Sequence, residues 1–244
     1  MRLLLINPNS TRSMTEQAHR SAERVAAPHT LLESINPTSS PASIEGHADE
    51  AMAVPAMLAE IRKGEMRGVD AYVIACFDDP GLGAAREIAR GPVIGICQAA
   101  VQVAMNIATR FTIITTLPRS VPIIEDLADA YGAGHRCRKV RSVDMPVLAL
   151  EEDLAHTEEM LVQEILKARQ EDGAEAIILG CAGMSELCDR LKARTGMPVI
   201  DGVTAAVKLA EALVGGGYAT SKVGAYDYPR AKENPACRLA DVAG

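Results

Sequence analysis

Residues 70–76 read DAYVIAC, and residues 175–181 read EAIILGC. The two stretches lie 105 positions apart, and each is a short apolar run that ends in a cysteine. An apolar run of this length, bounded by polar residues, is typical of a strand buried in a parallel sheet. The two stretches therefore predict equivalent strands in two halves of the chain.

The likeness between the two halves extends beyond these strands. Residues 92–104 align with residues 198–210 at an offset of 106, and seven of the 13 positions are identical. The dipeptide Ile6-Asn7 aligns with Ile114-Thr115 at an offset of 108. Offsets that drift so little indicate one unit of about 106 residues used twice, which is the size of a small domain.

Short apolar runs alternate with longer amphipathic segments along the whole chain. Strands are predicted over residues 3–6, 31–35, 71–75, 93–96, 111–114, 176–179 and 199–200, with a weaker one over 137–143. Helices are predicted over residues 10–27, 45–63, 151–171 and 205–214. This alternation predicts an α/β fold made of two pseudosymmetric, doubly wound parallel-sheet domains. We expect residues 1–97 and about 205–244 to form the first domain and residues 98–204 the second, with an irregular tail from residue 218.

Composition and charge exclude several classes of function. The 244 residues carry a net charge of −7 and only 3% aromatic residues, which argues against a nucleic-acid partner. No apolar run reaches about 18 residues, so we expect no membrane span. The N-terminal stretch lacks the pattern of a signal peptide, which predicts a cytoplasmic protein with reduced thiols. None of the six cysteines forms a CxxC pair or has a histidine at zinc-ligand spacing, so we expect no metal.

The two repeat-related cysteines, Cys76 and Cys181, are the strongest candidates for chemistry. Ligands bind beyond the carboxyl ends of parallel strands, which is where both thiols are predicted to lie. We expect a helix to begin directly after each cysteine and its N-terminus to lower the thiol pKa. If the halves face each other, the thiols approach one cleft from opposite sides. One could then take a proton from a stereocentre while the other returns a proton to the far face, which is racemisation or epimerisation.

The other four cysteines have no cysteine as their repeat counterpart, so we interpret them as structural: Cys97, Cys137, Cys188 and Cys237. In the active pair, one thiolate and one thiol would titrate together and not as two independent residues.

Three motifs resemble one known family. They are NPNST at residues 7–11, CFDDPG at residues 76–81 and LGCAGM at residues 179–184. They resemble the aspartate/glutamate/hydantoin racemase superfamily, and most of all its hydantoin racemase branch, which includes allantoin racemase. The resemblance covers residues 2 to about 217. It implies a cofactor-independent, homo-oligomeric two-base racemase with the active site between two α/β domains and with Cys76 and Cys181 as the catalytic residues.

The residues that follow each cysteine favour one substrate class. Amino-acid racemases of the superfamily follow their cysteines with Asn-Thr and with Thr-His or Thr-Glu, which hold a free α-carboxylate and α-amine. Here Phe77-Asp78 and Ala182-Gly183 follow, and they suit a neutral ring better than a zwitterion. Deprotonation at C5 of a hydantoin places charge on its C4 oxygen. We expect the backbone N–H groups of Ala182 and Gly183 to stabilise that charge.

Further substrate contacts are predicted at other strand ends. The amide of Asn7 could bind the imide edge of the ring, or Asn7 could simply form a turn. Its repeat counterpart Thr115, together with Thr116, could supply hydroxyl groups from the other domain or cap the strand. Asp78 could orient a substrate N–H group, whereas Asp79 is interpreted as the N-cap of the following helix. Arg119 and Ser120 follow the same strand as Thr115 closely and could touch substrate, or Arg119 could simply be solvated.

The sequence therefore predicts an isomerase that racemises 5-monosubstituted hydantoins, with a small hydantoin-type ring as its partner. Allantoin racemase is the nearest alternative, because allantoin is a hydantoin with a ureido group at C5 and pocket size would decide between them. An amino-acid racemase is disfavoured by the residues after each cysteine. A two-lobed solute-binding protein would normally carry an export signal. A thiol redox protein would be expected to carry a CxxC pair.

Overall fold

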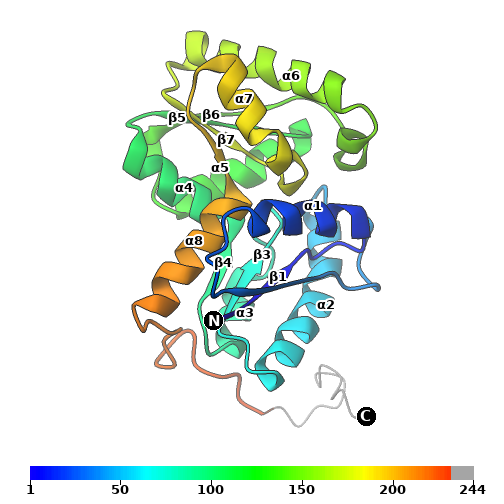
Figure 1. The fold of residues 1–244 in the computed structure, drawn as a ribbon, viewed down its shortest axis with the longest axis vertical. Helices are drawn as coiled ribbons and strands as arrows, with labels where there is room; N and C mark the ends of the chain where they lie inside the picture. Colours follow the sequence, from blue (N-terminus) through cyan, green and yellow to red (C-terminus); the bar gives the residue numbers. More distant parts are fainter. Residues whose placement is uncertain (232–244) are drawn as a thin grey trace.

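The computed structural model describes residues 1–231 and contains two parallel sheets with helices packed around them (Figure 1). The first sheet has the order β2-β1-β3-β4, with β1 at Arg2–Ile6, β2 at Leu31–Ile35, β3 at Ala71–Ile74 and β4 at Val93–Gly95. The second has the order β6-β5-β7-β8, with β5 at Phe111–Thr115, β6 at Cys137–Ser142, β7 at Ala176–Leu179 and β8 at Val199–Asp201. The predicted α/β fold with two equivalent sheets is confirmed.

The central strands of both sheets are apolar because both of their faces are covered. Every residue of β3 and of β7 is buried. Tyr72 pairs with Leu4 on one side and Val93 on the other, and Ile177 pairs in the same way with Thr112 and Val199. The edge strands β2 and β6 are partly exposed and carry more polar residues.

The helices fall between the strands, as the alternation of the sequence predicted. They are α1 at Arg12–Glu23, α2 at His47–Met66, α3 at Leu82–Ile88, α4 at Ile96–Ile107, α5 at Val121–Ala130, α6 at Leu154–Lys167, α7 at Cys188–Thr195 and α8 at Gly202–Gly215. The helix predicted over residues 151–171 begins later, after a 3₁₀ turn at Val147–Glu151, and ends in a π-helical turn at Ala168–Asp172.

Two helices cross between the halves. Helix α4 follows the first sheet but packs against β7 of the second, and α8 follows the second sheet but packs against β3 of the first (Figure 1). The two helices also contact each other. As a result, one apolar core includes Val73 and Ile178 from the two sheets and Val203 from α8. The predicted domain boundaries at residues 97/98 and about 204/205 remain a proposal.

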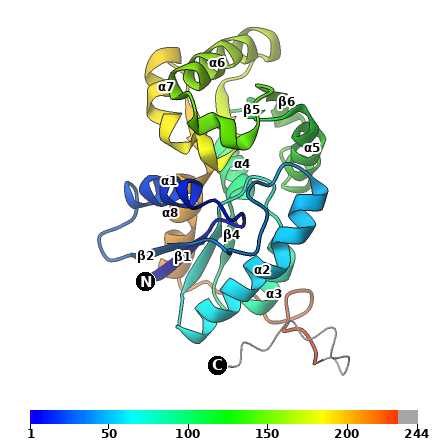
Figure 2. The ribbon, with the colours of Figure 1, turned by 90° about the vertical axis from the view of Figure 1, so that its right-hand side faces the viewer.

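The chain after α8 runs along the side of the molecule that carries α3 (Figure 2). Thr220 bonds to the carbonyl oxygens of Arg90 and Gly91, and the ammonium group of Lys222 donates to those of Arg86 and Glu87 near the end of α3. Residues 218–231 form no helix or strand, which agrees with the predicted irregular tail as far as the structure describes it. Cys237 and the rest of the predicted tail lie outside the described residues.

Within residues 1–231, no helix is long and apolar enough to cross a membrane. The same residues contain no group of three or more His, Cys, Asp or Glu side chains arranged to hold a metal ion.

Candidate active site

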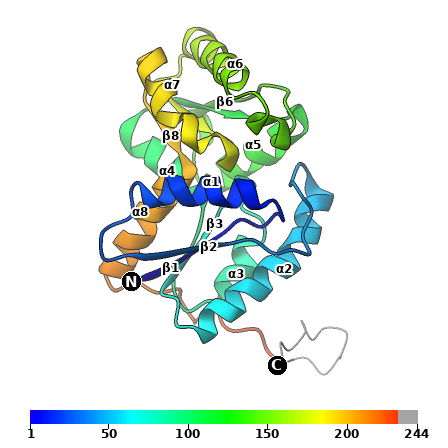
Figure 3. The same cartoon turned by 45° about the vertical axis from the view of Figure 1, so that its right-hand side comes forward.

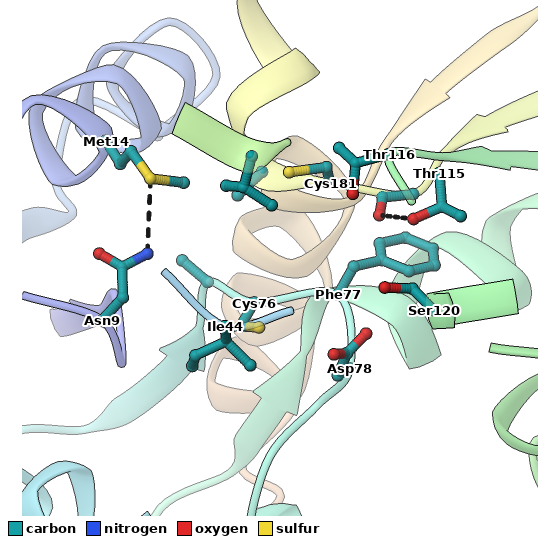
Figure 4. Close-up of a pocket in the computed structure, with 14 residues that line it drawn as sticks. Asn9, Met14, Ile44, Cys76, Phe77, Asp78, Thr115, Thr116, Ser120 and Cys181 are labelled. Carbon is teal, nitrogen blue, oxygen red and sulfur yellow. Dashed lines mark hydrogen bonds between the residues drawn. The ribbon is translucent and has the colours of Figure 1, made fainter. Parts of the chain in front are cut away.

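One pocket contains both candidate cysteines. Cys76 follows β3 and Cys181 follows β7, which hold equivalent positions in the two sheets. Figure 4 shows the two side chains on opposite sides of the pocket. The crossing of the chain between the two halves thus brings together two residues that are 105 positions apart.

The pocket encloses about 410 Å³ of space, including its open mouth. Polar groups gather on one side, where Thr115, Thr116 and Ser120 lie together (Figure 4). Apolar side chains supply much of the remaining wall. The full lining consists of Asn9, Met14, Ile44, Ala75, Cys76, Phe77, Asp78, Thr115, Thr116, Ser120, Val147, Gly180, Cys181 and Ala182.

Helix α1 lies between the two halves (Figure 3), and its Met14 lines the pocket. The side-chain amide of Gln17 donates to the carbonyl oxygen of Gly183 at 3.1 Å. Arg20 pairs with Glu186 at 2.6 Å, on the 3₁₀ turn Ala182–Leu187 that follows Cys181. These contacts fix the segment after Cys181 to the first half of the molecule.

A single hydrogen bond joins the halves at another point of the pocket wall. The carboxylate of Glu45 accepts the N–H of Val147 at 3.0 Å. Val147 lines the pocket, as does Ile44, the neighbour of Glu45. This bond therefore ties the segment that carries Ile44 in one half to the segment that carries Val147 in the other.

The environment of the two thiols differs from the expectation. A turn separates Cys76 from α3, which begins only at Leu82, so the prediction of a helix directly after this cysteine is wrong. Burial raises the pKa of Cys181 to about 12 and raises the pKa of Cys76 well above its ordinary value. The predicted lowering of both pKa values is therefore wrong, because removal from bulk water outweighs the nearby N–H groups.

The backbone N–H two residues after each cysteine opposes the effect of burial on the thiol pKa. The N–H of Asp78 lowers the pKa of Cys76, and the N–H of Gly183 lowers the pKa of Cys181, although burial dominates in both cases. The expected contact between the Gly183 N–H and a substrate oxygen stays a prediction. Ala182 lines the pocket, whereas Gly183 is not among the lining residues.

Asp78 and Asp79 are adjacent and both buried, but their carboxylates have different surroundings. The carboxylate of Asp79 accepts the N–H groups of Cys97 and Gln98 and the hydroxyl of Tyr131. Asp79 therefore caps the N-terminus of α4. Our prediction that Asp79 caps α3, the helix that follows it in the chain, is wrong. Asp79 has a φ of 43°, in the left-handed region, and its carboxylate packs so close to Gly95 that a Cβ there would lie 2.2 Å from it.

The carboxylate of Asp78 lines the pocket and accepts no hydrogen bond from any group within residues 1–231. Burial raises its pKa to about 6, and the negative charge of Glu50 adds to this effect, while His47 opposes it. In Figure 4 the Asp78 carboxyl group lies on the same side of the pocket as Cys76.

Asn7 does not line the pocket. Its amide nitrogen donates to Asn9 at 2.8 Å and to Thr15 at 2.9 Å, and its amide oxygen accepts the N–H of Asn9. Through these bonds Asn7 shapes the turn after β1. Asn9, and not Asn7, lines the pocket. The predicted contact between Asn7 and substrate is not supported by this arrangement.

The remaining predicted residues lie at the pocket: Phe77, Thr115 and Thr116. The hydroxyl of Thr115 donates to the carbonyl oxygen of Gly180 at 3.1 Å, so it keeps its lone pairs for a ligand donor. Sequence reasoning missed Asn9, Met14, Ile44 and Val147. Asn9 lay inside a quoted motif and could have been found there, but no sequence signal places Ile44 and Val147 at the site.

Three of the four cysteines interpreted as structural lie within the described residues. Cys97 and Cys188 are buried, and Cys137 is partly buried. None of them lines the pocket.

Comparisons with known proteins agree with this architecture. A family model described as Asp/Glu/Hydantoin racemase matches residues 3–210. The chain is 71% identical to a hydantoin racemase of Rhizobium meliloti, over 95% of this chain and 96% of the relative, and 47% identical to a hydantoin racemase of Pseudomonas sp. (strain NS671), over 96% and 94%. The solved allantoin racemase from Klebsiella pneumoniae superposes with a TM-score of 0.93 at 48% identity, over 95% of each chain.

Proposed function

The chain belongs to the Asp/Glu/Hydantoin racemase family and is a racemase, and we propose that it inverts C5 of 5-monosubstituted hydantoins through Cys76 and Cys181, without a cofactor. One observation carries the proposal: two cysteines from equivalent strands of two sheets line opposite sides of one pocket. The resemblance to hydantoin racemases supports the substrate class.

The proposed reaction needs one thiolate and one thiol. The thiolate takes the C5 hydrogen as a proton, and the electron pair of the C–H bond spreads onto the C4 oxygen. The thiol on the other face then delivers a proton to C5, and the electron pair returns to carbon. Cys76 and Cys181 exchange roles for the opposite enantiomer, so both directions use the same two residues.

Several lining groups suit a flat, neutral ring. We propose that Thr115 and Thr116 bond to the polar edge of the ring, that Phe77 and Ala182 contact it through apolar atoms, and that the N–H of Ala182 faces the developing charge on oxygen. No Lys, Arg or His is among the described residues that line the pocket, so the site offers no cation for a free α-carboxylate. This disfavours an amino-acid racemase.

Allantoin racemase remains the alternative function, and the likeness to the Klebsiella pneumoniae enzyme supports it. The apolar lining by Met14, Ile44 and Val147 favours a hydrocarbon or thioether group at C5 over a ureido group, because a buried ureido group needs hydrogen-bond partners. A homo-oligomeric state and a cytoplasmic location remain predictions from the sequence.

The test is an optical assay under reducing conditions without added cofactor or metal. The purified chain is incubated with L-5-isopropylhydantoin, L-5-benzylhydantoin and (S)-allantoin in separate reactions. We expect loss of optical rotation with the alkyl or aryl hydantoin, faster than with allantoin. Faster racemisation of allantoin would support the alternative, and no racemisation of any of the three would contradict the proposal.

A further inference from the structure

We infer that each of the two cysteines is held in its reacting position by the opposite half of the molecule: Gln17, on α1, positions Cys181, and Tyr131, directly after α5, positions Cys76. The inference rests on the proposed function and adds two positioning residues to it. Neither residue is among the described residues that line the pocket, so each would act through the turn that carries a cysteine and not through the substrate.

The two cysteines begin equivalent turns. The N–H of Asp79 donates to the carbonyl oxygen of Cys76 at 3.1 Å, and the N–H of Met184 donates to that of Cys181 at 3.1 Å. A bond of this kind ties the fourth residue of a turn to the first. A group that fastens the turn from outside therefore also restricts where the cysteine lies.

Gln17 fastens the turn after Cys181 from the first half. Its side-chain nitrogen donates to the carbonyl oxygen of Gly183 at 3.1 Å, and Gln17 is only 3% exposed. The backbone of Gly183 also lies beside the sulfur, since a Cβ added there would be 3.6 Å from Sγ of Cys181 and 3.9 Å from Oε1 of Gln17. The amide of Gln17 thus bonds to the residue that lies against the sulfur.

Half of the Gln17 amide is unpaired. Within residues 1–231, Oε1 of Gln17 is buried and has no hydrogen-bond partner. Burying an unpartnered amide oxygen costs free energy, and an apolar side chain in the same place would avoid this cost. The bond to Gly183 is therefore the contribution that the amide makes. Gln17 lies one helical turn after Met14, so this face of α1 serves both the pocket wall and the turn of Cys181.

Tyr131 fastens the turn after Cys76 from the second half. Its hydroxyl donates to Oδ2 of Asp79 at 2.8 Å, and the same carboxylate accepts the N–H groups of Cys97 and Gln98. Asp79 is the last residue of the turn that Cys76 begins. Its φ of 43° lies in the left-handed region, which a residue other than glycine holds only with support from its surroundings. The hydroxyl of Tyr131 supplies part of that support.

The two contacts are related by the internal repeat. Helix α1 follows β1 and α5 follows β5, and these two strands hold the same place in the two sheets. In each half, the segment of this helix therefore reaches across to the cysteine turn of the other half. The groups differ, because one contact joins an amide to a backbone carbonyl oxygen and the other joins a phenol to a carboxylate. Each cysteine would thus reach its reacting position only when the two halves are packed together.

A displaced thiol slows the proton transfer that it performs. A shift of about 1 Å in a reacting group can cost about 100-fold in rate, so we expect the smaller shift in Gln17→Met to lower kcat/KM about tenfold. Tyr131→Phe should lower it less, because Asp79 keeps two of its three hydrogen bonds. The two enantiomers have equal free energy, so kcat/KM must fall by the same factor in both directions. The rate alone therefore does not reveal which thiol is displaced.

The isotope effect of the C5 hydrogen does reveal it. In Gln17→Met, breaking of the C5–H bond becomes more rate-limiting for the enantiomer that Cys181 deprotonates, so the deuterium isotope effect on kcat/KM rises. For the other enantiomer, delivery of the proton by Cys181 becomes limiting, so the isotope effect of the substrate hydrogen falls. Tyr131→Phe, which displaces Cys76, should reverse this pattern. A general loosening of the pocket would change both directions alike.

The experiment measures racemisation of the L and D forms of a 5-alkylhydantoin, with hydrogen or deuterium at C5, for the unchanged enzyme, Gln17→Met, Tyr131→Phe and Arg24→Gln. Arg24→Gln is the matched control, because it breaks an exposed ion pair between the end of α1 and Asp189 of α7 and should leave the rates and isotope effects unchanged. Circular dichroism checks the fold. The enantiomer that Cys181 deprotonates is identified as the one whose C5 hydrogen Cys76→Ala still exchanges in deuterium oxide.

The proposal expects the isotope effects to change in opposite senses in Gln17→Met and Tyr131→Phe. Equal changes in the two directions, absence of the expected change in either folded variant, or the same changes in Arg24→Gln overturn it. If one variant fails to fold, the other decides alone by the sense of its change, and failure of both to fold overturns the proposal. Absence of racemisation by the unchanged enzyme defeats the proposed function itself, whereas the other outcomes concern an enzyme that racemises.

Discussion

Cys76 and Cys181 line one pocket although they follow strands of two different sheets. The crossing helices α4 and α8 pack each half onto the other, so the carboxyl ends of β3 and β7 meet at a shared cavity. The equivalent positions of β3 and β7 in the two sheets thus account for a pair of thiols on opposite sides of the pocket. The two sides are not identical, because Asp78 stands where the second half has Gly183.

Both pocket thiols should react slowly with alkylating agents. Burial raises both pKa values, so the thiolate fraction at pH 7.5 is far below that of an ordinary cysteine. We expect iodoacetamide to modify Cys76 and Cys181 at least ~10-fold more slowly than free cysteine at this pH, even after allowing for the greater nucleophilicity of a more basic thiolate. Mass spectrometry of peptides against time and pH measures this. Modification as fast as that of free cysteine would show that the thiolates are stabilised after all.

The two adjacent aspartates should affect stability very differently. Asp79→Ala removes the partner of two N–H groups at the start of α4 and of the Tyr131 hydroxyl, and should lower the free energy of unfolding by about 2–4 kcal/mol. Asp78→Ala removes a buried charge that has no hydrogen bond within residues 1–231, so it should leave this free energy unchanged or raise it. Urea unfolding of both variants tests the contrast. Equal losses would contradict the separate roles assigned to the two carboxylates.

The hydrogen bond between Glu45 and Val147 should contribute to substrate binding, because it holds together two parts of the pocket wall. Glu45→Ala removes the acceptor and should raise KM for a 5-alkylhydantoin about fivefold, with a smaller change in kcat. Glu45→Gln keeps a carbonyl oxygen that can accept the same N–H, so its KM should stay near that of the unchanged enzyme. Steady-state kinetics on both variants measures this, and equal KM values for Ala and Gln would rule out the bond as the cause.

The fold was predictable because it depends on the hydrophobic pattern and the internal repeat, which are visible in the sequence. Short apolar strands at repeated offsets predicted two equivalent sheets, and the position of β3 and β7 in those sheets predicted where the two cysteines lie. The repeat also explains why these two cysteines, and not Cys97 or Cys188, reach the pocket.

Features that depend on three-dimensional surroundings were not predictable. The pKa of Cys181 is set by burial, which no local pattern reports, so the expected effect of a helix N-terminus was overestimated. Asn7 and Asn9 are equally plausible as ligands in a sequence, and only the turn geometry gives Asn7 its internal bonds and puts Asn9 in the lining. Ile44 and Val147 reach the site from connecting segments, where neither helical nor strand periodicity applies.

The most direct test of a two-thiol mechanism is exchange of the C5 hydrogen in deuterium oxide, followed by NMR for each enantiomer separately. We expect Cys76→Ala and Cys181→Ala each to abolish racemisation, while each variant still exchanges the C5 hydrogen of one enantiomer, and the two variants act on opposite enantiomers. The unchanged enzyme should exchange and invert both. Full racemisation by either variant, or loss of exchange for the same enantiomer in both, would contradict the assignment of one thiol to each face.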